Sequence, residues 1–425
     1  MLLAERFSLY FCGVSYFIQN WWAVVTARFV RALFLSVILF SFVFGCSSSG
    51  KAPQSGTAAD INSRKQQADE LIAAGSYEAA VTVLAPLVSS ETKDSQIYFM
   101  IANAQWKLSS YDDAVANFEN GLRIDYSDGV AHLDFGEMLM EMGKVGRALT
   151  EFEFAIQFGE DESALAHYNY GLALFDFGRT DKALAEWGIA QTLDKSNAKY
   201  AEALGIGLTG RDDRKALEYF ETAEELGANE PSFHNNYGLL LIRLGMFRRA
   251  ETEFLRASEL KPEDDDYRLN QAVAHLRAGD FAGAVPILEQ LIARDATNPT
   301  YQIYLGRAYY EQERHQDCVD LLEPWLQNIQ PAVGDDDRGP DPVRLSDAHD
   351  ALAMSLRGIG ALDRAVVFSA SSVEFDPDNP VRLNNYGVIL AESGRIDEAK
   401  AQWRKVLDIE PDNAVAKQNL SAVGG

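Results

Sequence analysis

PSFHNNYGLLLIRLGMFRRAETEFLRASELKPED, residues Pro231–Asp264, contains two helix-forming segments joined at a glycine. In the first segment, residues suited to a buried face recur at helical spacing; they are His234, Tyr237, Gly238 and Leu241. Gly245 follows and offers the left-handed conformation that commonly ends a helix. These residues predict a first helix that buries one face and stops at a tight turn.

The second segment repeats this spacing with Ala250, Phe254 and Ala257. Pro262 ends it, because proline cannot continue a helix. Gly238 and Ala250 are small where the two helices are expected to cross, which lets the axes approach to roughly 8–10 Å. The segment is therefore predicted to be a helical hairpin with small residues at its crossing.

The order of aromatic, glycine, alanine and proline positions over 34 residues resembles the tetratricopeptide repeat. One such unit cannot bury its own apolar face, so further copies are expected. Equivalents of Ala250 occur mostly at steps of 34 residues, at Ala80, Ala114, Ala148, Ala183, Ala216, Ala284, Cys318, Ala365 and Ala399. The pattern predicts an all-α fold, and the resemblance implies a right-handed superhelical solenoid of about ten helix-turn-helix repeats, with first helices lining the concave surface.

One insertion divides the predicted array. Repeats one to eight occupy residues 61–332, and repeats nine and ten occupy residues 346–413. Between them, residues 333–345 read VGDDDRGPDPVRL, which predicts a solvated acidic insertion loop. Residues 414–425 are too short for another repeat and are predicted to form a C-terminal capping tail.

The N-terminal residues 1–45 have the features of a signal peptide. Ala32–Gly45 is a run of 14 uncharged residues behind Arg31, too short to span a membrane comfortably. It leads into Val43–Cys46, VFGC, which resembles the bacterial lipobox. The resemblance implies cleavage before Cys46 and acylation of its thiol. The alternative is a buried core helix that ends in this cysteine.

Residues 46–60 follow as the acylated cysteine and a small, polar segment, which predicts a flexible tether. Ser47 directly after the cysteine resembles the signal for sorting to the outer membrane. The expected location is therefore the outer membrane, lipid-anchored and facing the periplasm. Two or more acyl chains give a stable anchor, which one chain alone does not.

A second uncharged run, Phe7–Ala27, precedes this signal and is long enough for a membrane helix. Signal peptides rarely carry such a run in front of them. We hypothesise that residues 1–24 are a misassigned start, and that translation begins at an internal valine codon near Val24, Val25 or Val30.

Charge and motifs limit the classes of function. The formal net charge is −25 and no basic stripe interrupts it, so nucleic acid is not an expected partner. Basic protein segments remain compatible, although an acidic surface kept for solubility explains the charge equally well. We find no P-loop, HExxH, GxSxG or CxxC motif. The sequence therefore predicts neither an enzyme nor a cofactor.

Histidines were considered as metal ligands. Four of them, His132, His167, His234 and His349, occupy the fourth position of their repeats, where the family prefers an aromatic residue. Whole repeats separate them, which is too far for a shared metal with bonds near 2 Å. We predict no metal site and interpret these histidines as packed side chains.

A groove lined by the first helices is the predicted binding surface. Amides two residues before the eighth position of several repeats resemble the asparagine ladder of some tetratricopeptide repeat proteins, which implies binding of an extended peptide. The predicted groove residues are Asn169, Asn235, Asn236, Asn270, Asn384 and Asn385, with Arg243 and Arg277 at the edges. The alternative is that these asparagines bond only to the neighbouring helix.

These features together predict a protein-interaction scaffold. The Asn-Asn-Tyr-Gly motif at Asn384 followed by Gly-Arg-x-x-x-Ala up to Ala399 is similar to lipoproteins that assist assembly of type IV pili. The resemblance implies an outer-membrane lipoprotein that helps assemble an envelope machine, such as a pilus or a secretion system. The alternative is a periplasmic chaperone or a scaffold for polysaccharide export.

Overall fold

The computed structural model describes residues 58–89, 92–328 and 342–424, and the regular structure in these ranges is helical. Within them, no helix combines the length and apolar content needed to cross a membrane. Ile61–Gly425 forms one unit. The predicted signal peptide at residues 1–45, the acylation site at Cys46 and most of the predicted loop at residues 333–345 lie outside the described residues.

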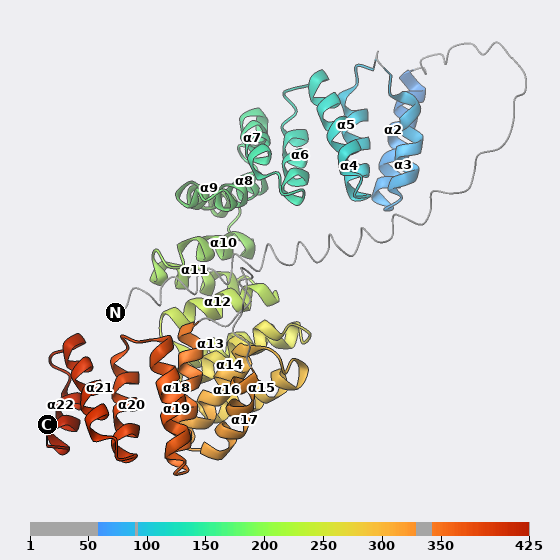
Figure 1. Cartoon of the computed structure of the whole chain (residues 1–425). Helices are drawn as coiled ribbons and strands as arrows, with labels where there is room; N and C mark the ends of the chain where they lie inside the picture. Colours follow the sequence, from blue (N-terminus) through green and yellow to red (C-terminus); the bar gives the residue numbers. More distant parts are fainter. Residues whose placement is uncertain (1–57, 90–91, 329–341, 425) are drawn as a thin grey trace, which may run out of the picture. The chain divides into compact units, whose positions relative to one another are not determined.

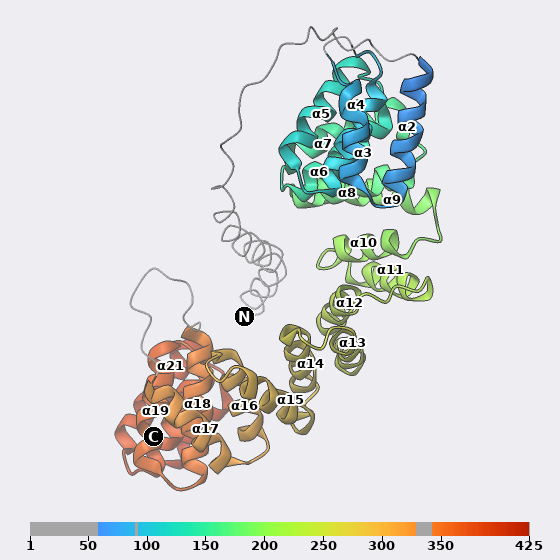
Figure 2. The same cartoon turned by 90° about the vertical axis from the view of Figure 1, so that its right-hand side faces the viewer.

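In the described ranges the helices form ten consecutive pairs, whose members lie side by side (Figures 1 and 2). The first five pairs are α2 (Ala58–Ala73) with α3 (Tyr77–Leu84), α4 (Ser95–Lys107) with α5 (Tyr111–Ile124), α6 (Gly129–Glu141) with α7 (Val145–Ala155), α8 (Ala164–Asp176) with α9 (Thr180–Leu193), and α10 (Ala198–Leu208) with α11 (Asp213–Glu225).

The next five pairs are α12 (Pro231–Arg243) with α13 (Phe247–Leu260), α14 (Asp265–Arg277) with α15 (Phe281–Arg294), α16 (Pro299–Glu311) with α17 (His315–Asn328), α18 (Pro342–Gly358) with α19 (Leu362–Phe375), and α20 (Pro380–Glu392) with α21 (Ile396–Ile409). A final helix, α22 (Ala414–Ala422), packs on α20 and α21. The predicted all-α array of about ten helical hairpins is thus confirmed.

Two helix starts differ from the sequence-based boundaries. Helix α2 begins at Ala58, so residues 58–60 are helical and do not belong to a tether. Helix α18 begins at Pro342, so residues 342–345 form its first turn and do not end a loop. Proline favours this position, because the first backbone N–H groups of a helix have no partner within it.

Many first helices begin at a side chain that caps them. Asp128 Oδ1 accepts the backbone N–H of Ala131 at 2.9 Å, and Asn413 Oδ1 accepts that of Ala416 at the same distance. An oxygen in this place satisfies a donor that the helix itself cannot. The same contact is made by Asp94, Ser163, Asn197, Asp264, Asn298 and Asn379. Short polar residues therefore set where most of the described pairs start.

The turn inside each pair requires a residue in the left-handed conformation. Gly143 and Gly245 adopt it with φ of 69° and 73°. In the second and eighth pairs Ser109 and Glu313 occupy the equivalent turn, with φ of 59° and 57°. A side chain in this conformation costs roughly 1–2 kcal/mol, which glycine avoids. These two turns are strained relative to the others.

Within a pair, a glycine of the first helix lies beneath a large residue of the second. A Cβ atom added to Gly238 would lie 2.6 Å from the ring of Phe254, and one added to Gly171 would lie 2.4 Å from Trp187. Phe254 is 1% exposed and Ala250 is fully buried. Sequence analysis predicted that Gly238 and Ala250 are the small residues at the crossing, and the ring of Phe254 is what a Cβ atom at Gly238 would meet first. The close approach of the helices leaves no room for a side chain under this ring.

The longer spacing between the third and fourth repeats is absorbed at the end of a second helix. Residues Ile156–Glu160 follow α7 as an irregular turn, in which Phe158 and Gly159 have non-helical backbone angles; Gly159 has φ of 117°. Few residues other than glycine adopt such a backbone angle. The inserted residue therefore leaves the first helices α6 and α8 in register with each other.

We expect Gly238→Ala to lower the free energy of unfolding by about 1–3 kcal/mol, because the added methyl group overpacks the ring of Phe254. Gly188→Ala is the matched control, since Gly188 lies inside α9 and an added Cβ meets no atom within 4 Å. Alanine at that site should raise the free energy of unfolding by roughly 0.5–1 kcal/mol. Urea unfolding measures both, and effects of the same sign would contradict the packing described.

Candidate functional site

The predicted groove asparagines lie on first helices, and several bond to the first helix of the preceding pair. Asn169 Nδ2 donates to Glu137 Oε1 at 2.6 Å, from α8 to α6. Asn270 Nδ2 donates to Asn235 Oδ1 at 2.8 Å, from α14 to α12. These contacts join neighbouring repeats, which is the second interpretation that the sequence left open. They also leave Asn169 Oδ1 without a hydrogen bond to any described residue.

The other predicted groove residues have different surroundings. Asn384 is only 8% exposed, whereas Asn236 is partly exposed and makes no side-chain hydrogen bond among the described residues. Arg243 pairs with Asp213 at 3.2 Å. Arg277 is exposed and has no ion pair within the described ranges. Asn236 and Arg277 are thus available to a ligand, and Asn384 is much less so.

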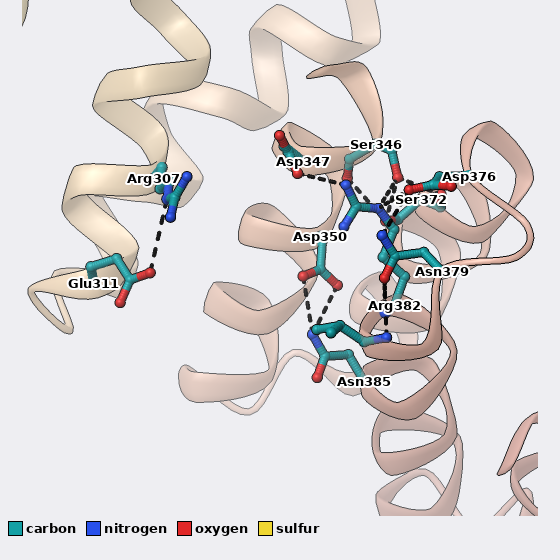
Figure 3. Close-up of polar contacts among 11 residues, drawn as sticks. Arg307, Glu311, Ser346, Asp347, Asp350, Ser372, Asp376, Asn379, Arg382 and Asn385 are labelled. Atoms are coloured by element: carbon teal, nitrogen blue, oxygen red, sulfur yellow. Dashed lines mark hydrogen bonds and ion pairs between the residues drawn. The ribbon is translucent and has the colours of Figure 1, made fainter. Parts of the chain in front are cut away.

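Asn385 bonds to a carboxylate of the preceding pair (Figure 3). Its Nδ2 lies 3.0 and 3.2 Å from the two oxygens of Asp350 on α18. Burial raises the pKa of Asp350 to about 6, and the bond from Asn385 opposes this shift. Sequence analysis named Asn385 but not its partner, which stands 35 residues earlier, as Asn235 does relative to Asn270.

Figure 3 also shows a polar cluster centred on Arg382, which joins α18, α19 and α20. The side chain of Arg382 is 8% exposed, with Nη2 at 2.5 Å from Asp347 Oδ1 and Nε at 3.4 Å from Asp376 Oδ2. Ser346 Oγ accepts from Arg382 and donates to the carbonyl of Ser372 at 2.7 Å. A buried charge is costly unless it is paired and hydrogen-bonded. The arrangement satisfies Arg382 and fits a structural role.

A cavity of about 430 Å³ lies on the first helices α6, α8 and α10. Its lining includes Glu137, Met140, Leu165, Tyr168, Asn169 and Tyr200. The rings of Tyr168 and Tyr200 have centroids 5.1 Å apart and are tilted by 45°. Leu165 is 47% exposed at the rim. We call this cavity the tyrosine pocket; of these six residues, sequence analysis had named only Asn169 as a groove residue.

One partly buried carboxylate, Glu137, lines the tyrosine pocket, and three others stand on the same helices α6, α8 and α10. Burial raises the pKa of Glu137, the nearby Asp134 raises it further, and the bond from Asn169 lowers it. Burial likewise raises the pKa of Asp134 and Asp176. The pKa of Glu202 rises to about 6 for the same reason. A desolvated carboxylate is stabilised by an added positive charge, so this region is suited to a cationic ligand group.

Three of the four histidines at the fourth repeat position bond to a glutamate of the second helix in their own pair. The Nδ1 to Oε2 distances are 2.7 Å for His132 with Glu151, 2.7 Å for His167 with Glu186, and 2.8 Å for His234 with Glu253. His349 instead packs between the rings of Phe368 and Phe375, with centroids at 5.8 and 5.4 Å. The side chain of each of these histidines therefore contacts the second helix of its own repeat.

One group of residues that sequence analysis missed could in principle hold a metal ion. Glu251, His275 and Asp280 have ligand atoms within 4.8 Å of one another. However, Asp280 Oδ2 lies 3.0 Å from Nδ1 of His275, and Glu251 Oε1 lies 3.4 Å from Nε2. Both oxygens of Asp280 already have partners, because Oδ2 lies within hydrogen-bond distance of the His275 ring and Oδ1 accepts the N–H of Gly283. The group fits a contact between α13, α14 and α15 better than a metal site.

A family model described as tetratricopeptide repeat matches residues 65–128, 133–197, 238–299 and 269–323, which is half of the chain. The chain belongs to the tetratricopeptide repeat family. A second model with the same description matches residues 382–413. Tetratricopeptide repeat proteins are generally scaffolds for protein interactions, so the family indicates a protein or peptide partner.

This tetratricopeptide repeat chain resembles longer proteins among its curated relatives. It is 22% identical to BBSome complex member BBS4 of Bos taurus over 371 residues, which cover 84% of this chain and 62% of that protein. It is 23% identical to protein O-mannosyl-transferase TMTC1 of Homo sapiens over 210 residues, which cover 49% of this chain and 23% of that protein. The chain therefore spans less than two thirds of the length of these relatives.

Solved tetratricopeptide repeat structures match parts of the chain. PilF of Pseudomonas aeruginosa is 18% identical with a TM-score of 0.40, covering 55% of this chain and 99% of that one. YrrB, described as having an unusual peptide-binding site, is 21% identical with a TM-score of 0.38, covering 43% and 95%. Similarity at this level supports no statement about partners.

His349 generates a prediction about acid stability. Burial lowers its pKa from 6.5 to about 4, because the folded chain disfavours the charged ring. Between these values the unfolded chain binds a proton that the folded chain does not, so stability falls as the pH drops from 6.5 toward 4. We expect His349→Phe to reduce this loss by about 1–2 kcal/mol at pH 5.

The measurement is urea unfolding of both proteins at pH 7 and pH 5. His132→Phe is the comparison, since His132 is bonded to Glu151 and replacing it removes a buried contact at both pH values. Equal pH dependence in wild type and His349→Phe would contradict the assignment.

Proposed function

We propose that this protein is a non-enzymatic scaffold that binds an extended segment of a partner protein across its first helices. The tyrosine pocket carries the proposal. Three consecutive pairs contribute to it, through Glu137 on α6, Tyr168 on α8 and Tyr200 on α10. An extended chain laid across successive first helices can place one side chain in such a pocket, and an amide such as Asn169 can bond to its backbone.

The carboxylates of this face support binding rather than catalysis. Glu137 accepts from Asn169, and Asp134 accepts from Asn103 Nδ2 at 2.7 Å. Both are held by neutral amides of neighbouring helices, and the positive charge of Lys107 acts on both. We therefore assign these carboxylates to partner recognition and to contacts between repeats.

For location, we propose an outer-membrane lipoprotein anchored through Cys46 and facing the periplasm. The support is the sequence alone: the apolar run Ala32–Gly45, the lipobox-like VFGC, and Ser47 behind the cysteine. An anchored scaffold in this compartment is suited to assembling an envelope machine such as a pilus or a secretion system. The acyl chains hold it at the membrane, and the repeats reach the partner.

Photo-crosslinking in intact cells tests the binding face. A photoreactive residue at Leu165, on the rim of the tyrosine pocket, should give a specific protein adduct in the outer-membrane fraction. The same residue at Leu255 is the matched control, because this leucine is 41% exposed on the second helix α13. Adducts of equal yield from Leu255, or none from Leu165, would contradict binding on the first helices.

Replacing the predicted acylation site tests the location. We expect Cys46→Ser to lose the acyl mass, to keep residues 1–45 uncleaved and to leave the outer-membrane fraction, since a serine has no thiol to acylate. Cys12→Ser is the control and should have no effect, because Cys12 lies in the segment predicted to be removed. A Cys46→Ser protein that stays acylated and membrane-bound would overturn the assignment.

A further inference from the structure

The face around the tyrosine pocket carries carboxylates whose orientation is fixed by hydrogen bonds from neutral side chains. On α6, Asp134, Glu137 and Glu141 follow each other at steps of three and four residues, which places them on one stripe. Each accepts a bond from a neutral side chain of an adjacent first helix: the donors are Asn103, Asn169 and Trp106, at 2.7, 2.6 and 2.7 Å. Neutral donors orient these carboxylates without cancelling their charge.

Helix α8 continues this stripe at the other side of the pocket. Asn169, Leu172 and Asp176 occupy the positions equivalent to the three acids of α6. Two ammonium groups lie nearby: Lys107, which interacts with Asp134 and Glu137, and Lys199 on the pocket rim. Acidic groups therefore outnumber basic groups along α6 and α8, and burial already penalises their charged forms.

The pocket itself is mostly apolar. Besides the two tyrosines, Met140, Phe152, Leu165 and Leu172 line it. Tyr200 is 5% exposed, so it forms a wall more than an open stacking surface. A cavity of about 430 Å³ with such a lining has room for one large apolar or aromatic side chain.

We propose that the tyrosine pocket receives a large apolar or aromatic side chain of an extended protein segment, and that lysine or arginine residues beside this anchor pair with the acidic stripe of α6 and α8. This inference rests on the proposed function and specifies the chemistry of the partner. The rival arrangement, an acidic segment held by Lys199, would add negative charge to a face that already carries an excess of it.

The test uses the full-length protein purified in detergent and four labelled seven-residue peptides, measured by fluorescence anisotropy. Three have a central tryptophan flanked by lysines, serines or glutamates, and the fourth has a central alanine flanked by lysines. We expect the Trp–Lys peptide to bind about tenfold more tightly than the Trp–Ser and Ala–Lys peptides. Raising the salt concentration should weaken binding of the Trp–Lys peptide more than binding of the Trp–Ser peptide, because salt screens the charged pairs.

Matched variants separate the two parts of the site. Leu165→Ser should weaken both the Trp–Lys and the Trp–Ser peptide several-fold, whereas Leu255→Ser, which removes an equally exposed leucine on α13, should leave binding unchanged. Glu141→Gln should reduce the preference for lysine flanks over serine flanks. Glu259→Gln, an exposed acid on α13, should not.

Tighter binding of the Trp–Glu peptide, or equal binding of the tryptophan and alanine peptides, would overturn the inference. Equal effects of Leu165→Ser and Leu255→Ser would do the same. If none of the peptides binds while Leu165 still forms its adduct in cells, the proposed function stands and this partner chemistry is wrong. If the peptides bind as expected and Leu165 forms no adduct, the pocket chemistry stands and the cellular role is wrong.

Discussion

In five of the ten described pairs the two helices approach closely because a glycine on the first lies directly beneath a large ring on the second. Gly238 under Phe254 and Gly171 under Trp187 are two instances of this contact. A ring seated over a glycine excludes water and fixes both the distance and the rotation of the helices. Each first helix is therefore presented at a set angle, and the surface built from successive first helices depends on that angle.

The array of helical hairpins could be predicted from the sequence because the contact between a small and a large residue recurs along the chain. Small and large residues recur at a fixed spacing, so one hairpin at Pro231–Asp264 identifies the others. Contacts between pairs were harder to anticipate. Asn169 bonds to Glu137, whereas Asn270 bonds to Asn235, at a different position of the preceding helix. Because the bonded partner does not always stand at the same spacing, it could not be predicted from the repeat pattern.

The pocket was missed for a related reason. Tyr168 and Tyr200 stand at different positions of their repeats, so the sequence pattern does not distinguish them from ordinary packing residues. Only the fold brings the centroids of their rings to 5.1 Å from each other. The cluster around Arg382 likewise joins residues from three helices. By contrast, the sequence did indicate that the first helices present Asn169, because its place relative to the glycine at position 171 is set within a single helix.

The irregular turn at Ile156–Glu160 has a consequence for the tyrosine pocket. It lies between the pair that supplies Glu137 and the pair that supplies Tyr168. The two sides of the tyrosine pocket therefore stand on either side of an irregular turn, and a residue inserted or deleted there would change how Glu137 and Tyr168 face each other.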